Sequence, residues 1–452
     1  MKQTLQAFGV QFARIVSARV ASHVFRPFVS AGTLEGRSIC SWARLRGWSL
    51  ARVGFGVALL ALGCQVYAQT NLTGAYKRAF TIDHTKVSNS DQISFPILIS
   101  GIFPFLATTA NGGQVLNANG YDIIFTSDAA GQNMLSFEID NYNPTTGAGS
   151  FWVGIPTLSH TSDTTIYMFY GIPSITTSQQ NPAGVWSNGY LSVYHLGNGT
   201  TVGLTDSGSV GYTLAGSGSA VAGRIGGGVG FSGDPGTYLY YDSPVAYPSG
   251  ASPVSLEAWV QLPPGAPPVT GREFVGYGEN SANGSRFGLA EWAQPDANIV
   301  GLEFENLGIG GPIWQDNNWH HLVGVYGGGA ISTPASMYYL DGVPLSTAAS
   351  SGITPAITTT ELKIGGIPTV TFCCAFNGSV DEVRVSSVAR SADWVATEYT
   401  NESSPSTFYS VGSQRGGPTG SYGTLACFPS TLDAGSNTTC SVVLAPGATG
   451  EV

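Results

Sequence analysis

The chain has 452 residues, of which 10% are charged, 11% are aromatic and 61 are glycine. Because a single hydrophobic core stops growing near roughly 250 residues, this length predicts two or three domains. The low charge and high glycine content favour many short strands joined by tight turns, and they leave little material for long amphipathic helices.

Acidic residues dominate once the first 68 positions are set aside. Those positions hold eight of the 18 Lys and Arg residues and one of the 28 acidic residues, which leaves 10 basic and 27 acidic residues in the rest of the chain. A surface with this negative net charge repels polyanions. We therefore expect neither nucleic acid nor an anionic membrane as a partner.

Residues 1–68 have the features of an export leader. Arginines precede the apolar run 53–62, and the small-residue pattern 66–68 follows it. The pattern predicts a secretory signal peptide that is cleaved after Ala68. Because the apolar run is too short to span a bilayer, we expect an exported mature chain without a transmembrane helix. Cys64 makes only a weak match to a lipoprotein signal.

Alternating runs separated by turn residues extend over residues 75–174 and predict an antiparallel β-sandwich. The motifs YKR at 76–78, FWV at 151–153 and DTTIYMFYG at 163–171 resemble the bacterial and archaeal domain of unknown function 2341. The resemblance implies an architecture only, because that family has no assigned activity. Together with the leader, it implies a location outside a bacterial cell or on its surface.

A second set of strand motifs extends over residues 189–411. The motifs SLEAWV at 255–260, NWHHLV at 318–323 and YYLDGV at 338–343 resemble a laminin-G-type, concanavalin A-like jelly roll. Asp341-Gly342 also predicts a hairpin, because both central positions of a type I′ turn need a positive φ. The expected fold class is all-β, with tandem antiparallel β-sandwiches of which the second is a concanavalin A-like jelly roll.

The remaining segments are one helix, a linker and a tail. Residues 391–401 form the one convincing helical pattern, with Ser391 as its N-cap. Residues 412–424 have the Gly, Ser and Pro content of a linker. Residues 425–452 resemble the opening strands of a bacterial immunoglobulin-like repeat, a domain that needs roughly 100 residues. We expect this repeat to be partial or poorly ordered.

Four of the six cysteines follow the leader. Cys427 and Cys440 form a plausible disulfide within the tail. Cys373 and Cys374 are adjacent, and neighbouring side chains on a strand point to opposite faces. We therefore expect two packed thiols without a bond between them.

The concanavalin A-like resemblance implies a lectin-like function, the binding of extracellular polysaccharide or cell-wall glycan. Sugar rings stack their C–H faces on exposed aromatic rings, and polar side chains satisfy their hydroxyl groups. The candidate ligand contacts, all expected in or beside loops of the second sandwich, are Trp292, Trp314, Tyr240, Tyr241 and Tyr277. One alternative is a structural adhesin with a protein partner, which the serial sandwiches also suit.

Glu303 and Glu305 carry a second alternative, a glycoside hydrolase of the concanavalin A-like fold. Residues two apart on a strand face the same side, roughly 6.8 Å apart at Cα, and paired carboxylates can hydrolyse glycosidic bonds. The chain lacks the longer acidic strand signature of such enzymes. We therefore favour a polar outward face without catalytic residues and leave enzymatic activity open.

Calcium is a further expectation, since laminin-G-like sandwiches often hold a cation at a rim of carboxylates and carbonyls. Asp381 is the first candidate ligand, and Asp234 is a weaker one. His320 and His321 are neighbours on a strand, so they face opposite sides and cannot bind one metal together.

Overall fold

The structure, a computed structural model, describes residues 72, 74–264, 271–294, 297–332, 334–345 and 352–417, apart from the side chains of 293–298, and the backbone of 425–428 and 439–442. The predicted leader at 1–68 lies outside these residues. The described chain is mostly antiparallel strand with few helices, so the predicted all-β fold class is confirmed. None of its helices is both long and apolar enough to span a bilayer.

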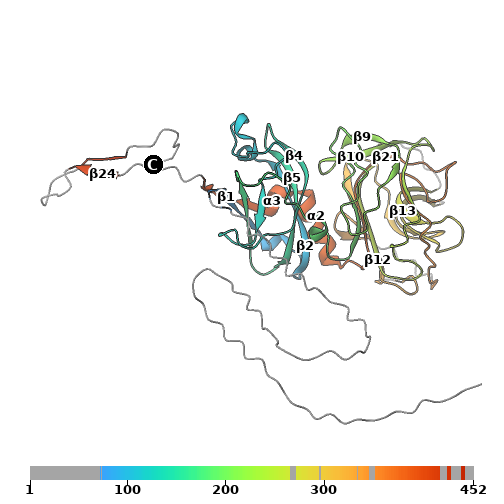
Figure 1. The fold of residues 1–452 in the computed structure, drawn as a ribbon. Helices are drawn as coiled ribbons and strands as arrows, with labels where there is room; N and C mark the ends of the chain where they lie inside the picture. The colour runs from blue at the N-terminus through green and yellow to red at the C-terminus, as the bar shows by residue number, and fades with distance from the viewer. Residues whose placement is uncertain are drawn as a thin grey trace, which may run out of the picture. The chain divides into compact units, whose positions relative to one another are not determined.

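Two small sheets form the first sandwich (Figure 1). Its strands before the second sandwich are β1 (Tyr76–Ile82), β2 (Gln92–Ile102), β3 (Ile124–Thr126), β4 (Phe137–Asn143), β5 (Ala148–Leu158) and β6 (Thr164–Tyr170). The order β2-β5-β4 makes one sheet, and β1, β6 and β3 are neighbours in the other. Alternate side chains of β1, Phe80 and Ile82, are buried in the core with Trp152 of β5.

The chain returns to the first sandwich after it has formed the second. β22 (Tyr409–Val411) and β23 (Arg415–Gly416) both pair antiparallel with β1. Tyr409 packs on Phe80, with 5.4 Å between the ring centroids. Part of the range predicted to be a linker thus extends a sheet of the first sandwich.

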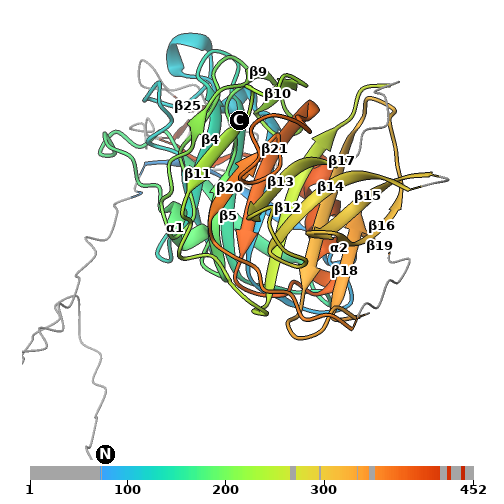
Figure 2. The same ribbon diagram turned by 90° about the vertical axis from the view of Figure 1, so that its right-hand side faces the viewer.

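An eight-stranded and a seven-stranded sheet form the second sandwich. The eight-stranded sheet contains β7 (Tyr190–Tyr194), β9 (Ser219–Ala222), β10 (Gly227–Ser232), β12 (Val254–Gln261), β17 (Trp319–Tyr326), β18 (Ser336–Leu340), β19 (Val343–Pro344) and β21 (Asn377–Ser386). The seven-stranded sheet contains β8 (Ala215–Gly216), β11 (Leu239–Asp242), β13 (Arg272–Gly278), β14 (Arg286–Gln294), β15 (Ala297–Phe304), β16 (Leu307–Pro312) and β20 (Glu361–Ile364). Figure 2 shows β13 to β16 side by side. Leu256 of one sheet and Leu289 and Leu302 of the other lie in the shared core.

The hairpin between β18 and β19 confirms the turn prediction. Asp341 and Gly342 have φ values of 51° and 77°. Most residues avoid this left-handed region, whereas Gly and Asp tolerate it.

The long helix α2 (Ala392–Ser403) begins at the predicted N-cap, where the Ser391 side chain accepts a hydrogen bond from the Trp394 N–H (3.1 Å). Val395 packs with Val323 on the side of the eight-stranded sheet away from the core. Asn401 bonds to the backbone of Leu98 in β2, so α2 joins the two sandwiches (Figure 1). The other α-helices described, α1 (Pro182–Val185) and α3 (Pro405–Phe408), are short.

In the tail, β24 (Leu425–Phe428) pairs with β25 (Thr439–Val442), which places Cys427 opposite Cys440. Their side chains lie outside the described residues. The disulfide between them therefore stays a prediction.

Candidate functional site

The seven-stranded sheet has one face in the core and one face turned away from it, which we call the outer face. Leu289 and Leu302 point into the core. Side chains alternate along a strand, so Arg286 on β14 and Glu303 on β15 lie on the outer face.

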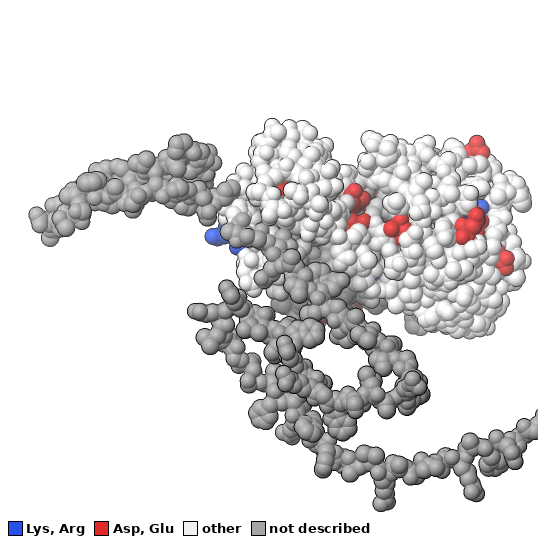
Figure 3. Space-filling view, in the orientation of Figure 1, with Lys and Arg blue, Asp and Glu red and all other residues white. Residues whose placement is uncertain are grey.

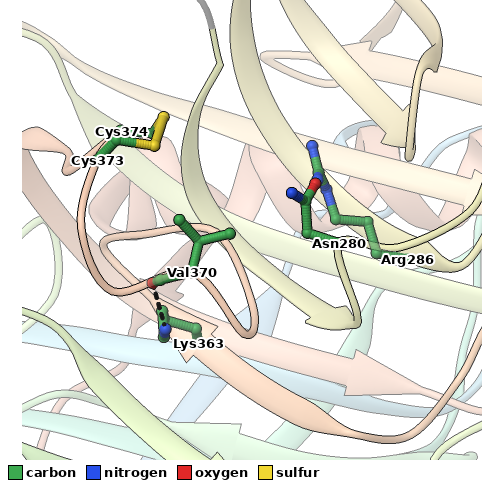
Figure 4. Close-up of a disulfide and its surroundings, with 6 residues drawn as sticks. All are labelled: Asn280, Arg286, Lys363, Val370, Cys373 and Cys374. Atoms are coloured by element: carbon green, nitrogen blue, oxygen red, sulfur yellow. Dashed lines mark hydrogen bonds between the residues drawn. A yellow bond between two sulfur atoms is a disulfide. The ribbon is translucent and has the colours of Figure 1, made fainter.

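Arg286 gathers three carboxylates on the outer face. Its Nε lies 3.0 Å from Glu273 Oε2, and its Nη2 lies 2.7 Å from Glu303 Oε1. Its Nη1 pairs with Glu305 and also donates to Asn280 Oδ1 (2.6 Å), the amide beside it in Figure 4. Burial, opposed by Arg286, raises the pKa of Glu273 to about 8. One guanidinium thus binds both carboxylates of the predicted catalytic pair.

Glycines make room for the flat side chains of this face. A Cβ at Gly276 or Gly288 would overlap the carboxyl group of Glu273, and a Cβ at Gly308 would overlap the ring of Trp292. Glycine in a strand interior is costly and marks a close approach of other atoms. Here it lets Glu273 and Trp292 lie against the backbone of the sheet.

Tyrosines border the same face near β11. Tyr240 is opposite Lys363 of β20 in the strand pairing. The Lys363 ammonium group lies 4.3 Å from the centroid of the Tyr238 ring and 3.3 Å from Glu361. Aromatic rings and paired charges therefore meet along one sheet surface.

The loop after β20 carries a disulfide between Cys373 and Cys374 (Figure 4), so the expectation of two separate thiols is wrong. That expectation assumed strand geometry, whereas these residues lie in a loop and Cys374 has a φ of 65°. The loop is attached to the sheet, because Lys363 Nζ donates to Val370 O (2.9 Å). Phe372 beside the disulfide is 82% exposed.

The structure separates the five predicted sugar contacts. Trp292 and Tyr240 lie on the outer face. Tyr241 points the other way and stacks on Tyr212, with 4.2 Å between centroids. Trp314 is partly buried and lies 4.3 Å from the His320 ring.

Tyr277 requires a correction. It lies near the end of β13, a strand whose residues are all buried. Its side chain has no exposed surface, and its hydroxyl donates to Pro248 O (2.8 Å). Its ring is therefore part of the core and has no face free for a sugar.

The two predicted calcium ligands already accept backbone hydrogen bonds. Asp381 is buried and accepts from the N–H groups of Ile225 (2.9 Å) and Glu382 (2.8 Å). Burial and the neighbouring Glu382 raise its pKa. Asp234 is exposed and accepts from the Gly236 N–H (3.0 Å) within a turn. Calcium binding by either residue stays a prediction.

A second candidate site was missed from the sequence. Glu138 and Asp140 of β4 line a cavity of about 310 Å³ together with His195 and Ser207. His195 Nδ1 lies 2.8 Å from Glu382, and Nε2 lies 3.3 Å from Glu138. Burial lowers the pKa of His195, but Glu382 and Glu138 outweigh it and raise the pKa overall. These groups come from distant parts of the chain, so no local sequence motif predicts that they meet.

Two other histidines pair with aspartates, and a third lies against an aromatic ring. His84 Nδ1 lies 2.7 Å from Asp163, and His320 Nδ1 lies 2.7 Å from Asp341. His321 is buried against Trp259, on the other side of β17 from His320. The predicted separation of these two neighbouring rings is thus seen.

Family comparisons agree with this architecture. Residues 231–396 match the model of the concanavalin A-like lectin/glucanases superfamily, and residues 119–195 match the domain of unknown function 2341. The two matches follow one another in the predicted order, so the resemblance stated from the sequence is confirmed. No curated protein matches the chain.

Several solved structures are similar to part of this chain at low identity. The binding domain of botulinum neurotoxin DC, in complex with SialylT, has 10% identity and a TM-score of 0.36 over 47% of this chain and 52% of that chain. Domain 4 of AbnA, a GH43 extracellular arabinanase from Geobacillus stearothermophilus in complex with arabinotriose, has 15% identity and a TM-score of 0.32 over 46% of this chain and 96% of that chain. This chain thus spans about half of the botulinum neurotoxin chain, and the likeness concerns the fold alone.

Proposed function

We propose that this protein binds carbohydrate on the outer face of its seven-stranded sheet. The observation that carries the proposal is the combination of a flat aromatic ring with unsatisfied acceptors. Trp292 lies against Gly308, and Glu273 Oε1 and Glu303 Oε2 are buried without a hydrogen-bond partner. A sugar ring can stack on the indole while its hydroxyl groups donate to carboxyl oxygens of this face.

The favoured ligand is a neutral extracellular polysaccharide or cell-wall glycan. Arg286 already pairs with three carboxylates, so it has little capacity left for an anionic sugar. Charged side chains on the face shown in Figure 3 are few and mainly acidic in the described part of the chain. The match to the lectin/glucanase superfamily supports the same ligand class. In the same proposal the chain acts after export, outside a bacterial cell.

Hydrolysis by Glu303 and Glu305 fits the geometry less well than binding does. A glycosidase needs its two carboxyl groups on either side of the scissile bond. Both carboxylates here contact the single guanidinium of Arg286, which occupies the space between them. Incubation of the purified chain with polysaccharides should therefore release no oligosaccharide, and released products would favour the hydrolase.

A glycan array with the full-length chain tests the proposal. We expect binding to neutral glycans, and Trp292→Ala should reduce the affinity at least tenfold because the stacking surface is lost. Val245→Ala, at a 76% exposed position away from the site, is the control and should bind like the unaltered chain. Parallel arrays with calcium and with a chelator test the calcium prediction. Absence of any bound glycan under both conditions would favour the protein-binding adhesin.

A further inference from the structure

A third cluster lies between α2 and the eight-stranded sheet, away from the carbohydrate face. It contains Glu257 of β12, His321 of β17 and Glu398 of α2, which are 2%, 1% and 2% exposed. One possible ligand atom from each residue can be chosen so that all three atoms lie within 4.8 Å of one another. Side chains that can bind a metal therefore meet at one buried point, and each comes from a different strand or helix.

The polar atoms at this point have no hydrogen-bond partner. Both ring nitrogens of His321, both carboxyl oxygens of Glu257 and Oε2 of Glu398 are buried and make no hydrogen bond among the described residues, although Glu257 Oε1 lies 3.6 Å from Arg384 Nη1. Buried polar atoms in native proteins nearly always have a partner, so each unpaired atom needs an explanation. An ion between these three residues would provide a common partner for them.

Neighbouring residues hold the carboxyl group of Glu398 by its other oxygen. Glu398 Oε1 accepts from the Tyr190 hydroxyl (3.0 Å) and from Arg384 Nη1 (3.2 Å), which leaves Oε2 free. Arg384 Nη1 also lies 3.6 Å from Glu257 Oε1. Outer partners of this kind orient metal ligands and fix which oxygen faces the ion. The three side chains thus resemble metal ligands whose supporting residues are already in place.

The surrounding charge also favours a cation. Arg384 is within 4 Å of four buried glutamates, Glu257, Glu382, Glu398 and Glu402. One guanidinium cannot balance four carboxylates, and His195 contacts only Glu382 among them.

We propose that Glu257, His321 and Glu398 bind one divalent transition-metal ion of the zinc class, which attaches α2 to the eight-stranded sheet. An imidazole nitrogen with two carboxylate oxygens suits zinc and its neighbours, whereas calcium takes six to eight oxygen ligands. The role is structural, because the site is buried and joins elements far apart in the sequence. This proposal is independent of carbohydrate binding.

Metal analysis of the full-length chain tests the site. The chain is unfolded with a chelator, refolded with zinc, manganese or calcium, dialysed, and analysed by plasma mass spectrometry. We expect about one zinc ion per chain, no retained calcium, and a higher melting temperature with zinc than with chelator. Less than one tenth of an ion per folded chain in every metal would overturn the proposal.

Two variants locate the ion. His321→Gln should lose at least nine tenths of the bound zinc, whereas the control His320→Gln, on the opposite side of the strand, should keep it. Equal zinc in both variants would refute the assignment to His321. If His321→Gln does not fold, cobalt substitution of the unaltered chain tests the site instead. Intense visible ligand-field bands would support a low-coordinate site with a nitrogen ligand. The weak spectrum of aqueous cobalt would contradict the proposal.

Discussion

Asn401 and Leu98 exchange two hydrogen bonds across 303 positions of sequence. The Leu98 N–H donates to Asn401 Oδ1 (2.7 Å), and Asn401 Nδ2 donates to Leu98 O (3.0 Å). Leu98 belongs to β2 of the first sandwich, and Asn401 belongs to the helix that packs on the second. One buried amide side chain therefore links the two sandwiches. Its partner is the backbone of Leu98, so substitution of the Leu98 side chain does not remove the bonded groups.

The first prediction concerns that link. Asn401→Ala leaves the N–H and C=O of Leu98 buried without these partners, which should lower the free energy of unfolding by about 2–3 kcal/mol. Chemical denaturation monitored by tryptophan fluorescence measures the change. Asn119→Ala, at an exposed position, is the control and should stay within about 0.5 kcal/mol of the unaltered chain. Equal stability of the two variants would show that water replaces the amide.

The second prediction concerns Arg384, which has no exposed side-chain surface. Its guanidinium also lies 4.7 Å from the Trp152 ring and 5.1 Å from the Trp186 ring. Arg384→Met leaves several buried carboxylates without a counter-charge and should cost about 3–5 kcal/mol of stability. Arg415→Ala, at an exposed position of β23, should cost less than about 1 kcal/mol in the same denaturation experiment.

The third prediction follows from the raised pKa of Glu273, which moves from 4.5 to about 8 because the carboxyl group is buried. The folded state then holds this proton more tightly than the unfolded chain does. The resulting stabilisation is complete below pH 4.5 and is lost as the pH rises toward 8. Glu273→Gln cannot titrate, so its stability relative to the unaltered chain should rise by roughly 2.7 kcal/mol between pH 6 and pH 9.

Urea denaturation of both proteins across this pH range provides the test. A constant difference between them would mean that Glu273 stays ionised in the folded protein. Glu279→Gln provides a control for the loss of one acidic residue on a neighbouring turn.

The fourth prediction concerns the glycine beneath Trp292. Gly308→Ala places a methyl group where the indole lies, so the ring must move off the sheet. We expect a fivefold or greater loss of glycan affinity with little loss of secondary structure, measured by titration calorimetry and circular dichroism. Gly236→Ala is the matched control, because a Cβ there meets only Asp234 Oδ1 at 3.6 Å. Unchanged affinity in Gly308→Ala would argue against stacking on Trp292.

Local patterns in the sequence predicted much of the fold. Alternation predicted the strands of both sandwiches, and Asp341-Gly342 predicted the hairpin between β18 and β19, because these features depend on neighbouring residues. Glu303 lies on β15 as alternation predicted, whereas Glu305 lies in the turn after that strand. Both contact Arg286.

Long-range pairing could not be read from the sequence. The return of residues 409–416 to β1 depends on a register that no local pattern encodes. Glu273 and Arg286 meet because β13 and β14 are neighbours in the sheet, and His195 meets Glu138 57 positions away. The exposed or buried state of Tyr277 likewise depends on which strands flank it. The candidate sites were therefore visible only in part, as single residues without their partners.

The pairing of β1 with β23 also determines where the chain enters and leaves the two sandwiches. Tyr76, at the start of β1, lies opposite Gly416, at the end of β23. The polypeptide thus enters and leaves the two sandwiches at adjacent points, although 340 positions separate Tyr76 from Gly416. The first and last strands of the two sandwiches therefore lie side by side. Tension between these points would peel the β1–β23 ladder open before it loaded the sheet that carries Trp292.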